Sequence, residues 1–283
     1  MDKVYLNGEY ISADQAKVSV FDRGFLFADS VYEVIPYYHG KSFQMDLHLQ
    51  RLQQSLSALN IIAEHDWEQV TDQLVALNGA GNLSVYLQVT RGAGDKRTHS
   101  IDTDMRPTVF ACTNPIENSY SASVDSVAGI KVIVCEDLRW HRCDIKSNSL
   151  LPNILVMEQA RLQGAQEALL QRNDTLLEGA SSNLLIVEGA TLIAPISEHA
   201  ILAGTTSNLV RQLAVENGIQ YLQQSISYRR LLAADEVWIS SSTRGLLPVL
   251  KIDQHVLGSG AKGVMWRRMY QLLAAQQRML FES

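Results

Sequence analysis

Hydrophobic and polar positions in the first half of the chain predict β-hairpins and two helices. Residues 4–11 form two β-rich arms around Asn7-Gly8, the pair that a tight primed turn favours. The stretch 31–45 has the same character and is predicted to turn at 39–41. Leucines at 49, 52, 56 and 59 recur at helical spacing, so a helix is expected over 46–59. The other elements expected here are a helix from Asp66 to Asn78-Gly79 and strands over 83–90 and 107–113.

The second half opens on a polar stretch and continues as hairpins separated by helices. Residues 114–126 contain one proline and several serines, which is typical of a linker between domains at 1–113 and 127–283. The pattern then predicts strands within 129–136, 167–179, 183–195, 235–242 and 246–253, and helices over 149–163, 205–217 and 261–280. Because the strands come as hairpins, with helices scattered between them, the pattern indicates a mixed α+β fold.

Composition narrows the class of protein. The chain has 283 residues, 46% of them hydrophobic, and a formal net charge of −6, with no run of basic residues. Nucleic-acid binding is therefore not expected, because affinity for phosphate backbones comes from clustered Lys and Arg. Three cysteines without C-x-x-C spacing indicate a reducing cytoplasm. The first residues contain no apolar signal core, and no apolar run is long enough for a membrane span.

The sequence lacks the motifs of several common classes of enzyme. There is no H-E-x-x-H and no Cys/His cluster at zinc spacing, so no metal is expected. Residues 91–97, RGAGDKR, lack the third glycine of a dinucleotide fingerprint. The segment EGASSN at 178–183 is not the nucleophile elbow of the hydrolases. What remains is chemistry that depends on a cofactor, or a binding role without catalysis.

Six segments carry a resemblance that hydrophobic periodicity does not show. They are FDRGFLFADSVYEVI (21–35), HLQRL (48–52), CDIKSNSLLPN (143–153), LLEGASSNLL (176–185), LAGTTSNLVRQLA (202–214) and DEVWISSSTRGLLPV (235–249). In this order they resemble the fold-type IV pyridoxal 5'-phosphate (PLP) enzymes, the class IV aminotransferase family. The resemblance covers nearly the whole chain. It implies a smaller N-terminal α/β domain and a larger C-terminal, PLP-binding domain with a barrel-like β core.

The resemblance implies that Lys146 and Glu178 carry the chemistry. Lys146 stands where the family forms a Schiff base with PLP, and a desolvated lysine is a competent nucleophile. Glu178 stands where the family keeps the pyridine nitrogen protonated, which a neighbouring carboxylate favours. The alternatives are a surface lysine and a carboxylate in an ordinary turn.

Five further positions match cofactor contacts of the family. The phosphate is expected on Arg51, on the backbone N–H groups of Thr205 and Thr206 at a helix start, and on Ser242. Leu202 matches a residue that packs on the cofactor ring. The alternatives are a solvated arginine on an amphipathic helix and an ordinary core leucine.

Three residues indicate which branch of the family this is. D-amino acid transaminases hold the substrate carboxylate with a Tyr, an Arg and a His, which correspond here to Tyr32, Arg97 and His99. Arg97 and His99 are two residues apart, so on extended chain their side chains project to one side. Without the resemblance, the simpler interpretation of the Arg97–His99 step is a solvated loop. In the family this loop reaches the neighbouring subunit's site, which implies a homodimer.

Four positions depart from the usual family pattern. Ala28 and Ser30 replace glycines, which could change the approach to Tyr32. Ala180 replaces a serine, removing a hydrogen bond near the cofactor. Arg244 replaces a small polar residue, and pointing inward it would add positive charge near the phosphate and favour acidic substrates.

These residues predict a PLP-dependent transaminase that moves an amino group between a D-amino acid and a 2-oxo acid. Two half-reactions on one site imply ping-pong kinetics. The partners expected are small amino acids and 2-oxo acids. The alternatives are aminodeoxychorismate lyase, a branched-chain L-amino acid aminotransferase, and a PLP-binding protein without catalysis.

Overall fold

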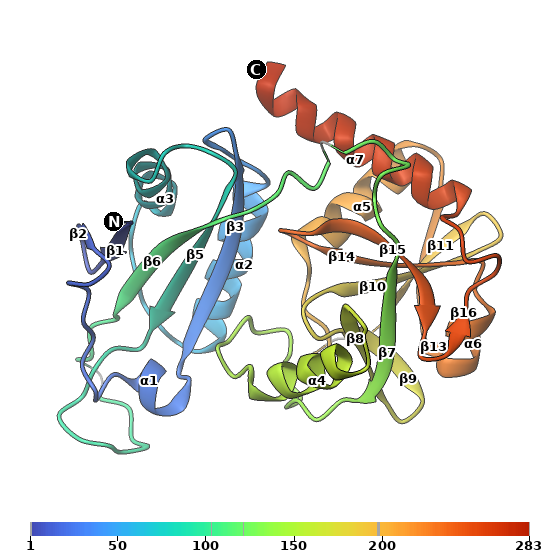
Figure 1. The fold of residues 1–283 in the computed structure, drawn as a ribbon. Helices are drawn as coiled ribbons and strands as arrows, with labels where there is room; N and C mark the ends of the chain where they lie inside the picture. Colours follow the sequence, from blue (N-terminus) through green and yellow to red (C-terminus); the bar gives the residue numbers. More distant parts are fainter. Residues whose placement is uncertain (1, 103, 121, 197–198, 283) are drawn as a thin grey trace. The chain divides into compact units, whose positions relative to one another are not determined.

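The computed structural model of the protein describes residues 2–102, 104–120, 122–196 and 199–282 (Figure 1). The chain divides into two compact units. Unit 1 runs to Asn118 and also includes Ile145–Ser149, and unit 2 comprises Ser119–Asp144 and the chain from Leu150 onwards. The boundary after Asn118 falls inside the predicted linker, of which Ser121 lies outside the described residues. Within the described residues, each helix is too short or too polar to cross a lipid bilayer.

Unit 1 contains a six-stranded antiparallel sheet in the order β2-β1-β6-β5-β3-β4. The strands are β1 (Lys3–Leu6), β2 (Glu9–Ser12), β3 (Ser30–Tyr38), β4 (Lys41–Ser42), β5 (Leu83–Thr90) and β6 (Val109–Pro115). Alternate residues of β5, from Leu83 to Val89, are buried, as expected for a sheet with one face against the core. The two hairpin turns place Asn7 and His39 at φ 50°, the left-handed conformation that tight hairpin turns require.

Helices α2 (Met45–Ala58) and α3 (Trp67–Leu77) pack against this sheet. Leu52 and Leu56 of α2 and Leu74 of α3 join the buried strand residues in one hydrophobic cluster. The carboxylate of Asp66 accepts a hydrogen bond from the Gln69 backbone N–H at 3.0 Å and so caps α3, as the sequence predicts. The helical spacing of the leucines therefore fixes which side of each helix faces the sheet.

A short helix, α1 (Arg23–Phe27), precedes β3 and ends at Ala28. Ala28 has φ 54° and ψ 27°, the left-handed conformation that glycine adopts without strain. Ser30, the second position where the family has glycine, starts β3 in extended conformation. Replacement of glycine therefore strains the backbone at Ala28 and not at Ser30.

The segment Ile145–Ser149 belongs to unit 1 because it pairs with the start of β3. Ser147 forms an antiparallel bridge with Val31. The Tyr32 backbone N–H donates to the Lys146 carbonyl at 3.0 Å. The sequence prediction placed this segment in the C-terminal domain, and the structure differs because these strand-like hydrogen bonds attach it to the N-terminal sheet.

Unit 2 contains a ten-stranded mixed sheet, part of which closes on itself. The strands are β7 (Ile130–Glu136), β8 (Glu167–Arg172), β9 (Thr175–Gly179), β10 (Asn183–Glu188), β11 (Thr191–Pro195), β12 (Gln220–Gln224), β13 (Ile226–Ser227), β14 (Glu236–Ser241), β15 (Gly245–Ile252) and β16 (His255–Val256). The order β10-β14-β15-β7-β8-β9 returns to β10 through the pair Asn183–Glu178. These six strands form a closed, barrel-like core.

Side chains of alternate strand positions separate into an inner and an outer cluster. Val132 and Leu169 belong to the cluster shared by the closed strands, whereas Ile133 and Cys135 pack with Val156 of a helix. That helix, α4 (Leu151–Leu162), connects the parallel strands β7 and β8, as a crossover must. The other helices of unit 2 are α5 (Thr205–Glu216), α6 (Tyr228–Ala233) and α7 (Val264–Glu282).

Candidate functional site

Lys146 lies against the face of Tyr32 in unit 1. Its Nζ is 4.3 Å from the centre of the Tyr32 ring, a cation–π distance. Both residues are half-buried, and the Lys146 backbone N–H donates to Ser55 Oγ at 3.2 Å. Two of the predicted residues are therefore brought together, and the ammonium is partly removed from water, the condition under which lysine becomes a nucleophile.

Arg51 is buried and paired with a carboxylate that the sequence interpretation missed. Its Nε and Nη2 donate to the two oxygens of Glu33 at 2.7 and 2.8 Å, and Glu33 also contacts His48 Nδ1 at 2.7 Å. Burial alone would raise the pKa of Glu33, but Arg51 and His48 lower it far below its usual range. Glu33 is consequently an anion that orients Arg51.

The predicted Arg97 and His99 both lie close to Phe27. The Arg97 Cζ is 5.0 Å from the centre of the Phe27 ring, and the His99 ring centre is 5.4 Å from it. Both side chains therefore contact the same aromatic ring. A guanidinium and an imidazole therefore both lie near the Phe27 ring, and these two groups suit a carboxylate ligand.

Arg23 fixes the backbone of the same loop. Its guanidinium donates to the carbonyls of Thr98 at 2.8 Å and Ser100 at 3.2 Å. Its Nε donates to Asp29 Oδ2 at 2.8 Å, and Arg91 donates to both oxygens of that carboxylate, at 2.8 and 3.0 Å. The loop position thus depends on charged residues near α1 that carried no sequence signal of their own.

Glu178 is buried in unit 2 and accepts hydrogen bonds from three donors. Its Oε1 accepts from Arg139 Nη1 at 2.5 Å, and its Oε2 accepts from Leu202 N at 3.1 Å and Asn183 Nδ2 at 3.3 Å. Burial raises the pKa of Glu178 to about 7, with Arg139 opposing the increase. A carboxylate of this basicity is suited to share a proton with a ring nitrogen.

Arg139 is itself held by a second buried carboxylate. Its Nε donates to Asp137 Oδ1 at 2.9 Å, and Arg172 donates to the other oxygen of Asp137 at 2.7 Å. Neither Arg139 nor Asp137 was predicted from the sequence. A carboxylate and an arginine two residues apart, directly after the apolar strand GIKVIVCE, are the signal that could have found them.

Three of the four predicted phosphate residues, Thr205, Thr206 and Ser242, gather at the start of α5, whereas Arg51 belongs to unit 1. Thr205 and Thr206 are buried there, and Thr205 Oγ1 lies 3.0 Å from Ser242 Oγ. The N-cap is Gly204, so this cap residue has no side chain to occupy the helix end. Backbone N–H groups of a helix start, with two hydroxyls, suit a phosphate. Leu202 is adjacent, its carbonyl accepting from Asn183 at 2.8 Å.

The donors and acceptors of unit 2 therefore fit PLP. A buried carboxylate is complementary to a protonated ring nitrogen, and a helix start with hydroxyls is complementary to a phosphate. The hydrogen bonds from Asn183 and Leu202 to Glu178 connect these two parts of the unit.

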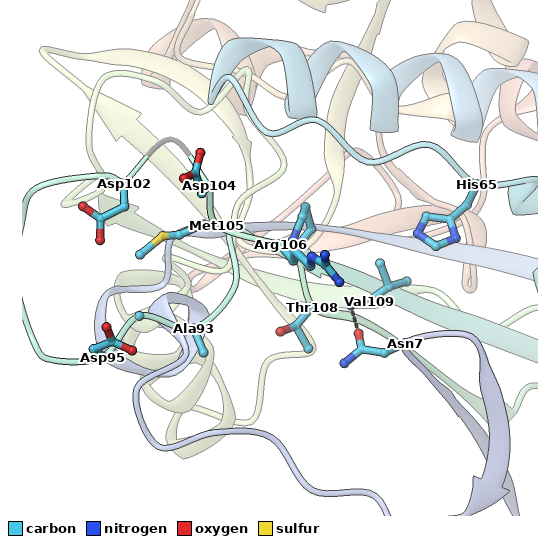
Figure 2. Close-up of a pocket in the computed structure, with 12 residues that line it drawn as sticks. Asn7, His65, Ala93, Asp95, Asp102, Asp104, Met105, Arg106, Thr108 and Val109 are labelled. Atoms are coloured by element: carbon cyan, nitrogen blue, oxygen red, sulfur yellow. Dashed lines mark hydrogen bonds between the residues drawn. The ribbon is translucent and has the colours of Figure 1, made fainter.

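A separate pocket of about 720 Å³ lies in unit 1, beside the loop that carries Arg97. Figure 2 shows carboxylates at Asp95, Asp102 and Asp104 and the cation Arg106 around it. The residues predicted for cofactor and substrate are not among the described residues that line it. Among the described residues, no group of three or more His, Cys, Asp or Glu is suited to a metal ion. The pocket is therefore not the predicted site.

Comparisons with known proteins identify the family. The model of the family "Amino-transferase class IV" matches residues 30–252. The D-alanine aminotransferase of Staphylococcus haemolyticus is 36% identical over 276 residues, covering 96% of both chains. The D-alanine aminotransferase of Bacillus licheniformis is 35% identical, covering 96% of this chain and 95% of the relative. This chain belongs to the class IV aminotransferases.

Solved structures of an aminotransferase and a lyase share this fold. A branched-chain amino acid aminotransferase of Escherichia coli has a TM-score of 0.86 at 24% identity, covering 97% of this chain and 94% of the other. The 4-amino-4-deoxychorismate lyase of Pseudomonas aeruginosa has a TM-score of 0.83, also at 24% identity, covering 96% and 98%. At this identity the likeness concerns the fold alone. The predicted fold class and the predicted aminotransferase family are confirmed.

The structure shows the contacts of two residues, Arg244 and Ala180, that depart from the usual pattern of class IV aminotransferases. The Arg244 guanidinium forms an ion pair with the buried Glu167 at 2.5 Å, so its charge is offset there. The expectation that Arg244 adds positive charge for acidic substrates therefore has no structural support. Ala180 is buried, and its carbonyl accepts from Asn153 Nδ2 at 2.8 Å.

Proposed function

We propose that this aminotransferase moves an amino group between a D-amino acid and a 2-oxo acid, with PLP as its cofactor and ping-pong kinetics. The observation that carries the proposal is the 36% identity, over 96% of both chains, to a protein named D-alanine aminotransferase. The Arg97–His99 pair beside Phe27 supports it, because an arginine and an imidazole together suit the carboxylate of an amino acid.

Lys146 is the proposed catalytic residue. PLP, when bound, supplies an aldehyde for the amino group and an electron-withdrawing ring for the bond that breaks at Cα. The Lys146 Nζ would hold the cofactor covalently, and when released would carry the proton to and from the substrate Cα. Contact with the Tyr32 ring keeps this amine half-buried in unit 1.

Glu178 is the proposed partner of the ring nitrogen. Burial raises its pKa to about 7, so it competes for a proton near neutral pH, and in its ionised form it favours a protonated ring. Leu202 is proposed to pack on the ring.

The proposed phosphate ligands are the backbone N–H groups of Thr205 and Thr206, the hydroxyl of Ser242, and Arg51. The helix start of α5 supplies a partial positive charge, and the hydroxyls supply directed donors. For Arg51, the bidentate pair with Glu33 fixes the plane of the guanidinium, the group whose geometry matches a phosphate.

The substrate carboxylate is proposed to bind Tyr32, Arg97 and His99, with the Arg97 loop acting in the partner's site of a homodimer. Exposed apolar side chains on α4 support self-association, namely Leu151, Ile154, Leu155 and Leu162. The three cysteines are free thiols, which supports a location in the cytoplasm.

The test is to supply D-alanine with 2-oxoglutarate and measure pyruvate. Transamination of D-alanine with no turnover of L-alanine supports the proposal. Turnover of L-leucine instead would assign the branched-chain specificity, and release of pyruvate from aminodeoxychorismate would assign the lyase. The Arg97→Ala variant should lose D-alanine turnover, whereas a lyase should tolerate it.

A further inference from the structure

Arg244 joins two turns of unit 2 through a buried carboxylate. It lies in the turn between β14 and β15, and its Nη2 donates to Glu167 Oε2 at 2.5 Å and to Ser181 Oγ at 2.9 Å. The Glu167 side chain is fully buried, whereas that of Arg244 is 32% exposed. The guanidinium thus reaches from the surface to an interior anion.

Glu167 in turn organises the tight turn between β9 and β10. Its Oε2 accepts from Ser181 Oγ at 2.8 Å and from Ser182 Oγ at 3.0 Å. A Cβ added to Gly179 would lie 2.2 Å from Ser182 Oγ and 3.2 Å from Glu167 Cδ. The backbone of residues 179–182 is therefore packed closely around this carboxylate.

A proposed cofactor ligand lies directly before one of these turns and another lies within the second turn. Glu178 directly precedes the turn 179–182, and Ser242 lies in the turn with Arg244. Hydrogen bonds from one guanidinium to Glu167 and Ser181 therefore connect the partner of the ring nitrogen to a phosphate ligand. A buried carboxylate that loses its cation is strongly destabilised or takes up a proton, so this connection depends on the positive charge at Arg244.

We propose that Arg244 is a positioning residue for the cofactor, which sets the separation of Glu178 and Ser242 by holding both turns on Glu167. The proposal rests on the proposed cofactor contacts of Glu178 and Ser242. Arg244 acts here through Glu167 and Ser181, and its charge is not directed at the substrate.

The test compares three variants in the full-length protein. Arg244→Gln removes the cation, and the double variant Arg244→Gln/Glu167→Gln removes both charges. The control is Arg230→Gln, because Arg230 forms a bidentate pair with Glu188 in the same unit, with side chains 27% and 37% exposed. Equilibrium dialysis measures the dissociation constant of PLP, and thermal unfolding without added PLP measures stability.

Arg244→Gln is expected to weaken PLP binding at least tenfold, and Arg230→Gln by less than twofold. In the double variant the unfolding midpoint should recover, because the buried charge is gone, while PLP binding stays weak. This separation excludes a purely structural role. PLP affinity within twofold of wild type in Arg244→Gln, or affinity that recovers together with the midpoint in the double variant, would overturn the proposal. Wild-type protein that binds PLP but does not turn over D-alanine would instead refute the proposed substrate.

Discussion

At the scale of single residues, Glu178 lies in a buried cluster of hydrogen-bond donors in unit 2. Three donors surround the Glu178 carboxylate, and the only charged one among the described hydrogen bonds is Arg139. Burial raises the pKa of Glu178, and Arg139 opposes that increase. Arg139 therefore keeps the carboxylate available as an anion near neutral pH.

Arg139→Gln should move the acidic limb of the pH–activity profile upward by about one pH unit or more, the size of effect that a close opposite charge has on a carboxylate. Loss of the cation raises the Glu178 pKa further, so a higher pH is needed to ionise it. The measurement is kcat/KM for D-alanine against pH. Arg172→Gln is the matched control, because Arg172 bonds to Asp137 and to backbone carbonyls. If the acidic limb does not move in Arg139→Gln, Arg139 does not control the ionisation of Glu178.

Arg51→Met should lower the free energy of unfolding by about 3 kcal/mol at neutral pH, because Glu33 would remain buried without its main cation. The folded-state pKa of Glu33 lies below its ordinary value of 4.5. Its contribution to stability is therefore complete above that value and is lost as the pH falls through the folded-state pKa. In Arg51→Met, burial is no longer offset by this cation and raises the folded-state pKa of Glu33 above its wild-type position, so the stability difference from wild type should shrink as the pH falls.

Urea unfolding between pH 3 and pH 7 measures this effect. Arg161→Met is the control, since the Arg161–Glu158 pair is exposed and should contribute little. Equal midpoints for the two variants at neutral pH would show that the Glu33 cluster adds no stability.

At the scale of elements, most helix and strand positions follow from the pattern of apolar residues, and the exceptions are short. The predicted helices over 149–163 and 205–217 correspond to α4 and α5. The short helices α1 and α6 and the strands β12, β13 and β16 were not predicted. Two to six residues contain too little periodicity to distinguish a helix from a turn.

Ala28→Gly should stabilise the protein by about 1 kcal/mol, because an alanine with positive φ is strained at the end of α1. Thermal unfolding should show an increase in Tm of about 2–4 °C for a chain of this size. Ala76→Gly in the exposed part of α3 is the control and should have the opposite sign. A lower Tm for Ala28→Gly would mean that the left-handed conformation carries no strain.

At the scale of the whole molecule, the proposed site residues come from both units. Unit 1 contributes Tyr32, Arg51, Arg97, His99 and Lys146, and unit 2 contributes Glu178, Leu202, Thr205, Thr206 and Ser242. The chain passes from unit 2 into unit 1 for the five residues around Lys146 and then returns.

Mixing inactive Lys146→Ala chains with inactive Arg97→Ala chains should restore about a quarter of the wild-type activity. If the protein forms the proposed homodimer and its subunits exchange freely, half of the dimers contain one chain of each kind. Such a dimer has one complete site when the Arg97 loop acts in the partner's site. The measurement is pyruvate release from D-alanine after unfolding and refolding the mixture. No activity in the mixture would place Arg97 in its own chain's site.

The sequence by itself determined the family, most of the helices and strands, and the identity of the candidate residues. Apolar spacing decides which faces are buried, and the segments around Lys146 and Glu178 are recognisable because reactive groups need particular residue types. The structure adds contacts between residues that the sequence had already named. Lys146 contacts the Tyr32 ring, and Arg97 and His99 both lie near the Phe27 ring.

Only the tertiary structure decided which charged residues support these candidates. Glu33 and Arg51 are 18 positions apart, Arg139 and Glu178 are 39 apart, and Glu167 and Arg244 are 77 apart. Such ion pairs form only when the order of the strands brings distant parts of the chain together. The sequence around one charged residue does not indicate which distant residue will be its partner. The attachment of Lys146 to the N-terminal sheet has the same origin, since it depends on hydrogen bonds to β3.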